Sequence, residues 1–224
     1  MTTDIRTARW TGAAYLALGL AGMAGFLLVR PRVAAEPQLA ALGVTLELAV
    51  VIAQAAAAVG FFALFRRDRP VEAFATATFG MGNALAILGS AALLTAAIAV
   101  SSDPSLAPAG DLDGTVVLLR VVADAFWSVG NVFFGLWLIP MGWFVLSTRR
   151  MPVVLGWFLV VGGVGYVLSA VLVVTAPGLV AELMVIPATV GEFWMIGYLL
   201  IRGIRPAIVD ANPQSTAISE QRSV

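Results

Sequence analysis

The stretch NVFFGLWLIPMGWFVLSTRRMPVVLGWFLVVGGVGY, residues 131–166, decides the fold of this chain. It contains an apolar run that ends at a basic turn, and a second apolar run that begins directly after that turn. An apolar helix of about twenty residues is long enough to cross the hydrocarbon core of a bilayer, which is about 30 Å thick. The stretch therefore predicts two membrane helices joined by a short turn.

The composition extends this interpretation to the whole chain. Of the 224 residues, 60% are hydrophobic and 12% are charged, about half the charged fraction of an average soluble domain. Cys and His are absent, which excludes disulfides, Cys-His zinc sites and histidine acid–base chemistry. The formal net charge is zero, so nothing argues for nucleic acid. We predict no cofactor and no metal, with the lipid bilayer as partner.

Apolar runs of this length recur along the chain, and the longest connection between them, residues 101–113, is too short for a soluble domain. We predict an all-α, multi-pass transmembrane helix bundle with six spans in one domain, residues 1–205, followed by a polar tail, residues 206–224. The expected spans are 10–29, 39–65, 71–100, 115–147, 153–174 and 179–201. The fourth is longer than a bilayer requires, since it would extend about 50 Å.

The arginines predict the orientation. All 13 basic residues are arginines, and ten of them lie at the N-terminus, in the turns after the second and fourth spans, and at the C-terminal end. Arg30, Arg32 and Arg120 lie toward the opposite side. The positive-inside rule then places both termini in the cytoplasm.

A family resemblance rests on the quoted stretch and on the last span, EFWMIGYLLIRG, residues 192–203. The matching residues are Phe133, Phe134, Gly135, Ser147, Arg149, Pro152, Leu155, Gly156, Gly163, Gly165, Tyr166, Glu192 and Arg202. With these, the chain resembles a bacterial integral-membrane family catalogued as domain of unknown function 4386. The resemblance implies a multi-pass protein of the bacterial plasma membrane and implies no activity. Relatives often carry a histidine where this chain has Trp127 and Ser128, so chemistry that needs that imidazole is not carried over.

Glycines and prolines inside the spans carry packing information. The glycines of the fifth span, Gly156, Gly162, Gly163 and Gly165, predict a surface on which another helix packs closely. Pro140 and Pro187 predict interruptions of the fourth and sixth spans, because proline lacks the N–H of the helix ladder.

Polar side chains within the apolar runs are the candidate ligand-binding residues, because a charge near the bilayer midplane is costly and is usually functional. Glu192 is expected near the midplane, with Gln54 and Asn83 as possible partners. It could equally be a structural hydrogen-bonding group between two helices. Counting from the basic ends puts Glu47 and Glu182 at the outer edge of their spans. Arg120 and Asp124 are expected at or above the outer interface, one turn apart and able to pair. The candidates are Glu47, Asn83, Arg120, Asp124, Glu182 and Glu192.

Three functions remain open from these residues. The first, which we predict, is a non-enzymatic membrane protein with a polar cavity that opens to the outer side and binds or passes a small lipophilic or cationic ligand. The second is a membrane-embedded enzyme acting on a lipid, for which Ser128, Ser169 and Tyr166 would have to act with carboxylates. The third is a structural or regulatory partner of another membrane protein. The sequence leaves the oligomeric state open.

Overall fold

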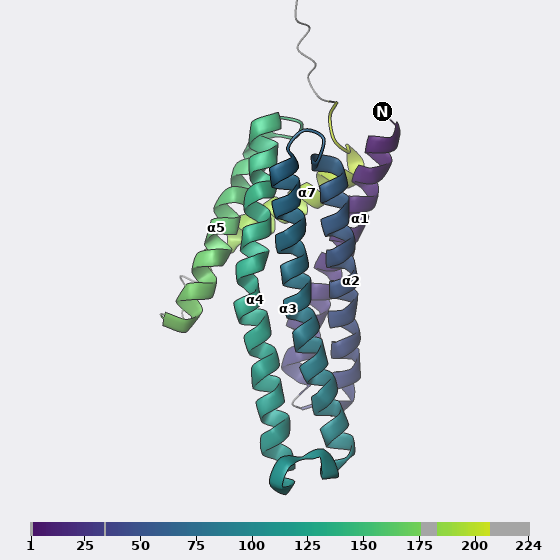
Figure 1. Cartoon of the computed structure of the whole chain (residues 1–224), viewed down its shortest axis with the longest axis vertical. Helices are drawn as coiled ribbons and strands as arrows, with labels where there is room; N and C mark the ends of the chain where they lie inside the picture. The colour runs from purple at the N-terminus through teal and green to yellow at the C-terminus, as the bar shows by residue number, and fades with distance from the viewer. Residues whose placement is uncertain (1, 34, 176–182, 207–224) are drawn as a thin grey trace, which may run out of the picture.

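The computed structural model describes residues 2–33, 35–175 and 183–206, which form an elongated bundle of helices (Figure 1). The described part of the chain contains no strand, which confirms the all-α prediction. Its α-helices are α1 (Thr2–Met23), α2 (Ala40–Phe65), α3 (Pro70–Ser102), α4 (Leu112–Thr148), α5 (Val153–Thr175) and α7 (Ile186–Ile201).

Five helical segments are long and apolar enough to span a membrane, and α7 is a shorter apolar helix of 16 residues. The chain is therefore a multi-pass membrane protein. The first segment includes α1, a π-helical continuation over Ala24–Val29 and a 3-10 turn over Arg30–Arg32, so the polar lead-in before residue 10 is helical as well. The predicted sixth span, 179–201, overlaps α7, and its first residues, 179–182, lie outside the described residues.

Helices α3 and α4 are longer than a bilayer core requires. They have 33 and 37 residues, which correspond to about 50 and 55 Å at the rise of an α-helix. They project beyond α5 and α7 at one end of the bundle, the lower end in Figure 1. Two short 3-10 turns, Pro104–Leu106 and Pro108–Gly110, connect them there, where the composition predicts a loop.

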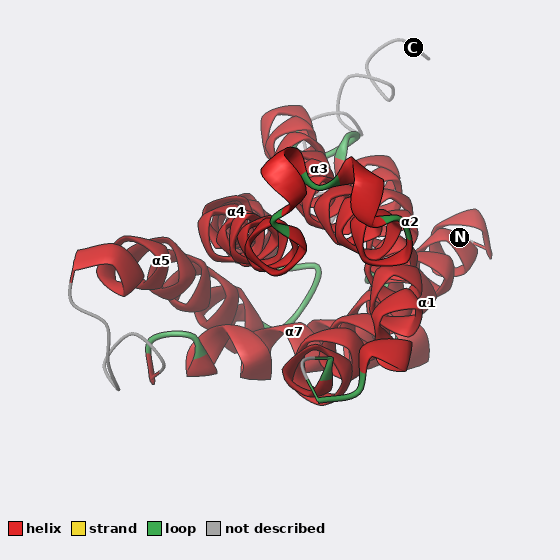
Figure 2. Cartoon of the chain, turned by 90° about the horizontal axis from the view of Figure 1, so that it is seen from below, coloured by secondary structure: helices red, strands yellow, loops and turns green. Residues whose placement is uncertain are grey.

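The helices are arranged as a ring (Figure 2). Each of α1 to α4 packs against the helix that follows it in the chain. Helix α5 packs against α7, and α7 packs back against α1. Aromatic side chains fill the core between them. Tyr15, Phe61 and Trp137 meet edge to face with ring centroids 5.2–5.6 Å apart, and Phe65 stacks on Phe144 at 3.7 Å.

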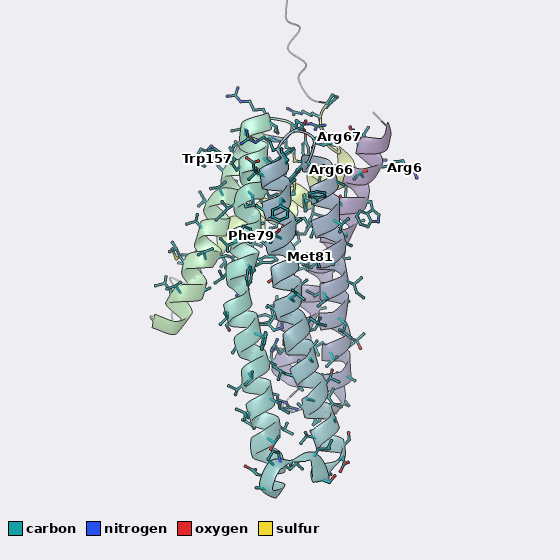
Figure 3. The ribbon with its side chains drawn as sticks, viewed as in Figure 1. Arg6, Arg66, Arg67, Phe79, Met81 and Trp157 are labelled. Carbon is teal, nitrogen blue, oxygen red and sulfur yellow. The ribbon has the colours of Figure 1, made fainter. Side chains whose placement is uncertain are left out.

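One end of the bundle is rich in arginine. The N-terminus, the α2–α3 turn and the α4–α5 turn meet at this end, and Figure 3 shows Arg6, Arg66 and Arg67 there. Arg150 is 8% exposed; its guanidinium donates to the Asp68 carboxylate of the α2–α3 turn and, at 2.6 Å, to the Arg205 carbonyl after α7. Arg150 therefore joins three chain segments. The side of the membrane that this end faces stays a prediction.

Glycines bring α4 and α5 into backbone contact, as predicted. Gly135 and Gly142 of α4 lie opposite Gly163 and Gly156 of α5, respectively, and we call these four residues the glycine seam. A Cβ at Gly163 would lie 2.7 Å from the Gly135 carbonyl oxygen, and one at Gly142 would lie 2.7 Å from that of Gly156. Real Cβ atoms do not approach this closely, so larger residues would push the helices apart.

The two prolines lie in different settings. Pro140 is inside α4, whereas Pro187 occupies the first turn of α7. Residues 184–185 form a turn after a helical residue 183, and α7 begins at Ile186, so the sixth apolar run is interrupted just before Pro187, as predicted. In a first turn the missing N–H of proline breaks no hydrogen bond of the helix.

Candidate functional site

A cluster of charged side chains joins three segments near the long end of α4. We call Arg30, Glu47, Asp124 and Trp127 the Arg30 cluster. Arg30 Nη1 donates to Glu47 Oε1 at 3.1 Å, and its Nη2 and Nε lie 2.6 and 2.7 Å from Asp124 Oδ1. Trp127 Nε1 donates to the same Glu47 oxygen at 3.0 Å. One guanidinium thus links α2 and α4 to the segment that follows α1.

The Arg30 cluster holds a cation between carboxylates and aromatic rings. Its two carboxylates differ in environment, because the side chain of Glu47 is 6% exposed and that of Asp124 is 63% exposed. The guanidinium carbon lies 5.6 Å from the centroid of the Trp127 ring and 6.0 Å from that of Phe26, within the range of a cation–π interaction. Two carboxyl groups therefore face one guanidinium.

The cluster brings together two of the predicted site residues and corrects one expected pair. Glu47 and Asp124 both pair with Arg30, and whether they bind a ligand stays a prediction. Asp124 pairs with Arg30, and not with Arg120 one turn away on its own helix. The sequence interpretation missed Arg30 as a site residue, although an arginine at the outer end of an apolar run was the available signal. Glu182 lies outside the described residues.

Glu192 contacts a different residue from those expected. Tyr15 of α1, which is 2% exposed, donates its hydroxyl to Glu192 Oε1 of α7 at 2.6 Å. Tyr166 of α5 also lies near this carboxylate. The expected partners, Asn83 and Gln54, contact each other, with Asn83 Nδ2 donating to Gln54 Oε1 at 3.5 Å. Glu192 is therefore bonded between α1 and α7, as its structural interpretation requires.

Buried polar residues line the contact between α2 and α3 at intervals of seven residues. Seven-residue spacing keeps side chains on one helix face, and the antiparallel pairing brings the two series into register. Glu47 lies beside Ser90, and Gln54 beside Asn83. The residues of this polar seam are all buried, and they are Glu47 and Gln54 on α2 and Thr76, Asn83 and Ser90 on α3.

Several atoms along the polar seam have no hydrogen-bond partner among the described residues. The indole nitrogen of Trp137 in α4 also lacks a hydrogen-bond partner. The atoms are Gln54 Nε2, Thr76 Oγ1 and Trp137 Nε1. A buried polar atom without a partner costs about 1–3 kcal/mol, and more than about 90% of such groups in native proteins have one, from protein or water. The seam is therefore an exceptional part of this interior.

A surface groove of about 350 Å³ lies between α1 and α2, and it is apolar. Trp10, Ile52 and six alanines line it. None of the candidate residues contributes to it, so this groove is not the predicted polar cavity. Within residues 2–33, 35–175 and 183–206, no three His, Cys, Asp or Glu side chains are grouped so as to hold a metal ion.

The candidate nucleophile Ser128 is engaged by its own helix. Its hydroxyl donates to the Asp124 carbonyl at 3.1 Å, a bond that serine commonly makes to the carbonyl four residues earlier. This contact offers no activation of the hydroxyl for attack on a lipid.

The fold and these sites define the class: an all-α, multi-pass membrane protein with polar groups inside its helix bundle. The family model described as "Domain of unknown function (DUF4386)" matches residues 10–203, and the chain belongs to this family. The family resemblance of the sequence is thus confirmed. No curated protein and no solved structure was found to match the chain. The family description names no activity, so a function has to be argued from geometry.

Proposed function

We propose that this protein is a non-enzymatic protein of the bacterial plasma membrane that binds or passes a small lipophilic cation at the Arg30 cluster. One observation carries the proposal. Two carboxylates from different helices, Glu47 and Asp124, hold a cationic group between them, and the rings of Phe26 and Trp127 flank it. Carboxylates together with aromatic faces are what organic cations bind in proteins.

Arg30 acts as the resident cation of this site. Its guanidinium uses Glu47 Oε1 and Asp124 Oδ1, which a ligand cation would also use. An incoming cation therefore has to displace Arg30 or bind the remaining oxygens. Asp124 is 63% exposed and keeps a second carboxylate oxygen, which an incoming cation could contact while Arg30 is bound.

The orientation in this proposal follows the arginines. The basic turns and the N-terminus share one end of the bundle (Figure 3), and the Arg30 cluster lies on the segments that lead away from it. With the arginine-rich end in the cytoplasm, the cluster would face the outer side. A cation would then enter from outside the cell.

The test is thermal melting of the purified protein in detergent with a series of tetraalkylammonium and aromatic ammonium ions. A ligand that binds the folded state raises the melting temperature, and the stabilisation grows with the logarithm of the ligand concentration divided by Kd. We expect stabilisation of the parent protein, and stronger stabilisation of Arg30→Gln because the competing guanidinium is gone. The exposed neighbour Arg32 supplies the matched control, since Arg32→Gln should respond as the parent does.

A second pair of variants identifies the site. Glu47→Gln and Asp124→Asn, each in the Arg30→Gln background, should weaken the stabilisation by ammonium ions because each removes a carboxylate from the cluster. Stabilisation that is absent from both the parent and Arg30→Gln, or that is unchanged by both carboxylate substitutions, would contradict a cation site at this cluster.

A further inference from the structure

The apolar groove between α1 and α2 opens on the outside of the helix bundle. Trp10, Ala13 and Ala17 line it on α1, and Ala49 and Ile52 are among its lining residues on α2. Trp10 and Ile52 are 51% and 71% exposed, so the groove is reached from the surrounding bilayer. Its lining on each helix covers about 10 Å at the rise of an α-helix. The groove therefore runs along the helix axes, as the acyl chains of a bilayer do.

Two exposed arginines lie beyond the groove, toward the arginine-rich end of the bundle (Figure 3). Arg6 lies one turn before Trp10 on the same face of α1, and Arg67 follows the end of α2. A Cβ at Gly60 of α2 would lie 2.3 Å from Thr11 Oγ1 of α1, and this contact fixes the register of the two antiparallel helices. Counted from it, both arginines lie at about the same height. Neither forms an ion pair with a carboxylate of the described residues.

The order of these groups along α1 matches the order of groups in a phospholipid. The hydrocarbon core of a bilayer is about 30 Å thick and the whole bilayer about 40–45 Å, which leaves about 5–8 Å for each headgroup layer. Tryptophan favours the boundary between the two layers. With Trp10 at that boundary, Arg6 lies one turn, about 5–6 Å, further out, at the height of the headgroups. The alanines then lie at the height of the acyl chains.

Charge favours a lipid over a second copy of this chain as the occupant of the groove. Two copies in one membrane have the same orientation, so a symmetric contact along the groove would bring Arg6 and Arg67 of both copies together. These like charges would repel one another. The phosphate of a lipid would instead neutralise them.

We infer that the groove binds an acyl chain of an anionic phospholipid from the leaflet at the arginine-rich end, with the lipid phosphate at Arg6 and Arg67. The acyl chain lies over the alanines, and the Trp10 ring packs beside it. Each arginine near an anionic lipid contributes about fivefold to binding. This lipid site is separate from the Arg30 cluster and does not depend on cation binding there.

The first test is native mass spectrometry of the full chain, released from micelles that contain equal amounts of dioleoylphosphatidylglycerol and dioleoylphosphatidylethanolamine. The acyl chains are identical, so a preference reports the headgroup. We expect the first retained lipid to be mainly phosphatidylglycerol, and Arg6→Gln and Arg67→Gln each to lower this preference about fivefold. Arg149 is also exposed and lies at the same end of the bundle, after α4, so Arg149→Gln is the matched control. Equal retention of both lipids by the parent, or equal losses in all three variants, would overturn the inference.

The second test locates the acyl chain with phosphatidylglycerol that carries a photoactivatable diazirine on one chain, diluted into phosphatidylethanolamine liposomes containing the protein. We expect stronger labelling of peptides from residues 10–17 and 49–56 than of peptides from α5. The double variant Ala13→Leu, Ala17→Leu fills the groove and should abolish this excess. Both alanines are exposed, so the core is left intact; should the double variant melt below the parent, Ala17→Leu alone takes its place.

Gly19→Leu is the control for the added side chain, because a Cβ there would meet nothing within 4 Å, and it should label as the parent does. Equal labelling of α5 and the groove, or an excess that survives filling of the groove, would overturn the inference. A dimer of the parent that the double variant converts to a monomer would also overturn it, since a second copy would then occupy the groove. The melting test of the Arg30 cluster is independent of these outcomes.

Discussion

The α2–α3 and α4–α5 contacts make an instructive pair. Both join antiparallel neighbours across a short turn, and both repeat every seven residues. Along the glycine seam, Gly135 lies opposite Gly163 and a Cβ on either would collide with the carbonyl of the other. Along the polar seam, Gln54 instead lies opposite Asn83, and their amides meet at 3.5 Å.

The difference shows how one spacing serves two purposes. Small residues let backbones approach closely, so packing holds the membrane helices together and no room remains between them. The polar side chains between α2 and α3 instead leave buried atoms that need hydrogen-bond partners. The glycine seam therefore stabilises the bundle by close packing, whereas the polar seam places groups that need hydrogen bonds inside it. The pair Asp68–Arg150 joins the turns at the ends of the two seams.

The largest effect is expected in the glycine seam. Gly163→Leu would place a side chain against the Gly135 carbonyl and Ile139, and overpacking of this kind should lower the free energy of unfolding by about 3 kcal/mol or more. Thermal melting in detergent measures it. Gly19→Leu is the control, since nothing lies within 4 Å of a Cβ there. Equal melting temperatures of Gly163→Leu and Gly19→Leu would show that the glycine seam is not a close-packed contact.

The second largest loss of stability is expected at the Arg150–Asp68 pair, which connects the turns at the ends of the two seams. Arg150→Gln removes the charge that is paired with Asp68 and leaves that carboxylate unpaired near the turn. Loss of one partner of a buried pair costs about 3–5 kcal/mol, and we expect about 3 kcal/mol or slightly less because Asp68 keeps some contact with solvent. The exposed neighbour Arg149 tests whether charge alone matters, and Arg149→Gln should melt as the parent does. A similar loss in both would mean that the contact is not the cause.

The polar seam is tested by the buried hydroxyl of Thr76. If water satisfies it, Thr76→Val should lose about 1 kcal/mol, the typical net value of one hydrogen bond. In a dry seam the same change would be neutral or stabilising, since an unsatisfied group is removed. Thr95 on the same helix bonds to its own Ala91 carbonyl, so Thr95→Val shows the effect of the substitution on the helix alone.

The hydrogen bond between α1 and α7 should contribute less. Tyr15→Phe removes the bond to Glu192 and keeps the aromatic packing, and such bonds within membrane proteins average about 0.6 kcal/mol. Denaturant titration of both proteins measures the difference. A loss of several kcal/mol would show that α7 is held mainly by this bond.

The smallest effect is expected at the exposed edge of the Arg30 cluster. Asp124 is 63% exposed, and exposed ion pairs contribute about 0–1 kcal/mol. Asp124→Asn should therefore leave the melting temperature nearly unchanged at moderate salt. A marked loss of stability would mean that the cluster is a structural contact comparable to Arg150–Asp68.

The sequence by itself determined the class of this protein, most of its helix boundaries and the close-packed glycine surface. These are local properties: an apolar run of sufficient length must be helical in a bilayer, because each backbone polar group has to bond within its own segment. The arginines mark the ends of the runs in the same way. Glu47 and Asp124 were found because a charge within an apolar run is visible in the chain itself.

Only the tertiary structure decided which of these side chains meet. Arg30 bonds to side chains of α2 and α4, and Tyr15 bonds to Glu192, 177 positions away in the sequence. Asp124 pairs with Arg30 and not with Arg120 of its own helix. The register of α2 against α3 converts two separate seven-residue series into one polar seam. Such contacts depend on how antiparallel helices are aligned and rotated about their axes, which is set by packing between neighbours and by the turns that join them, and no single stretch of sequence contains that information.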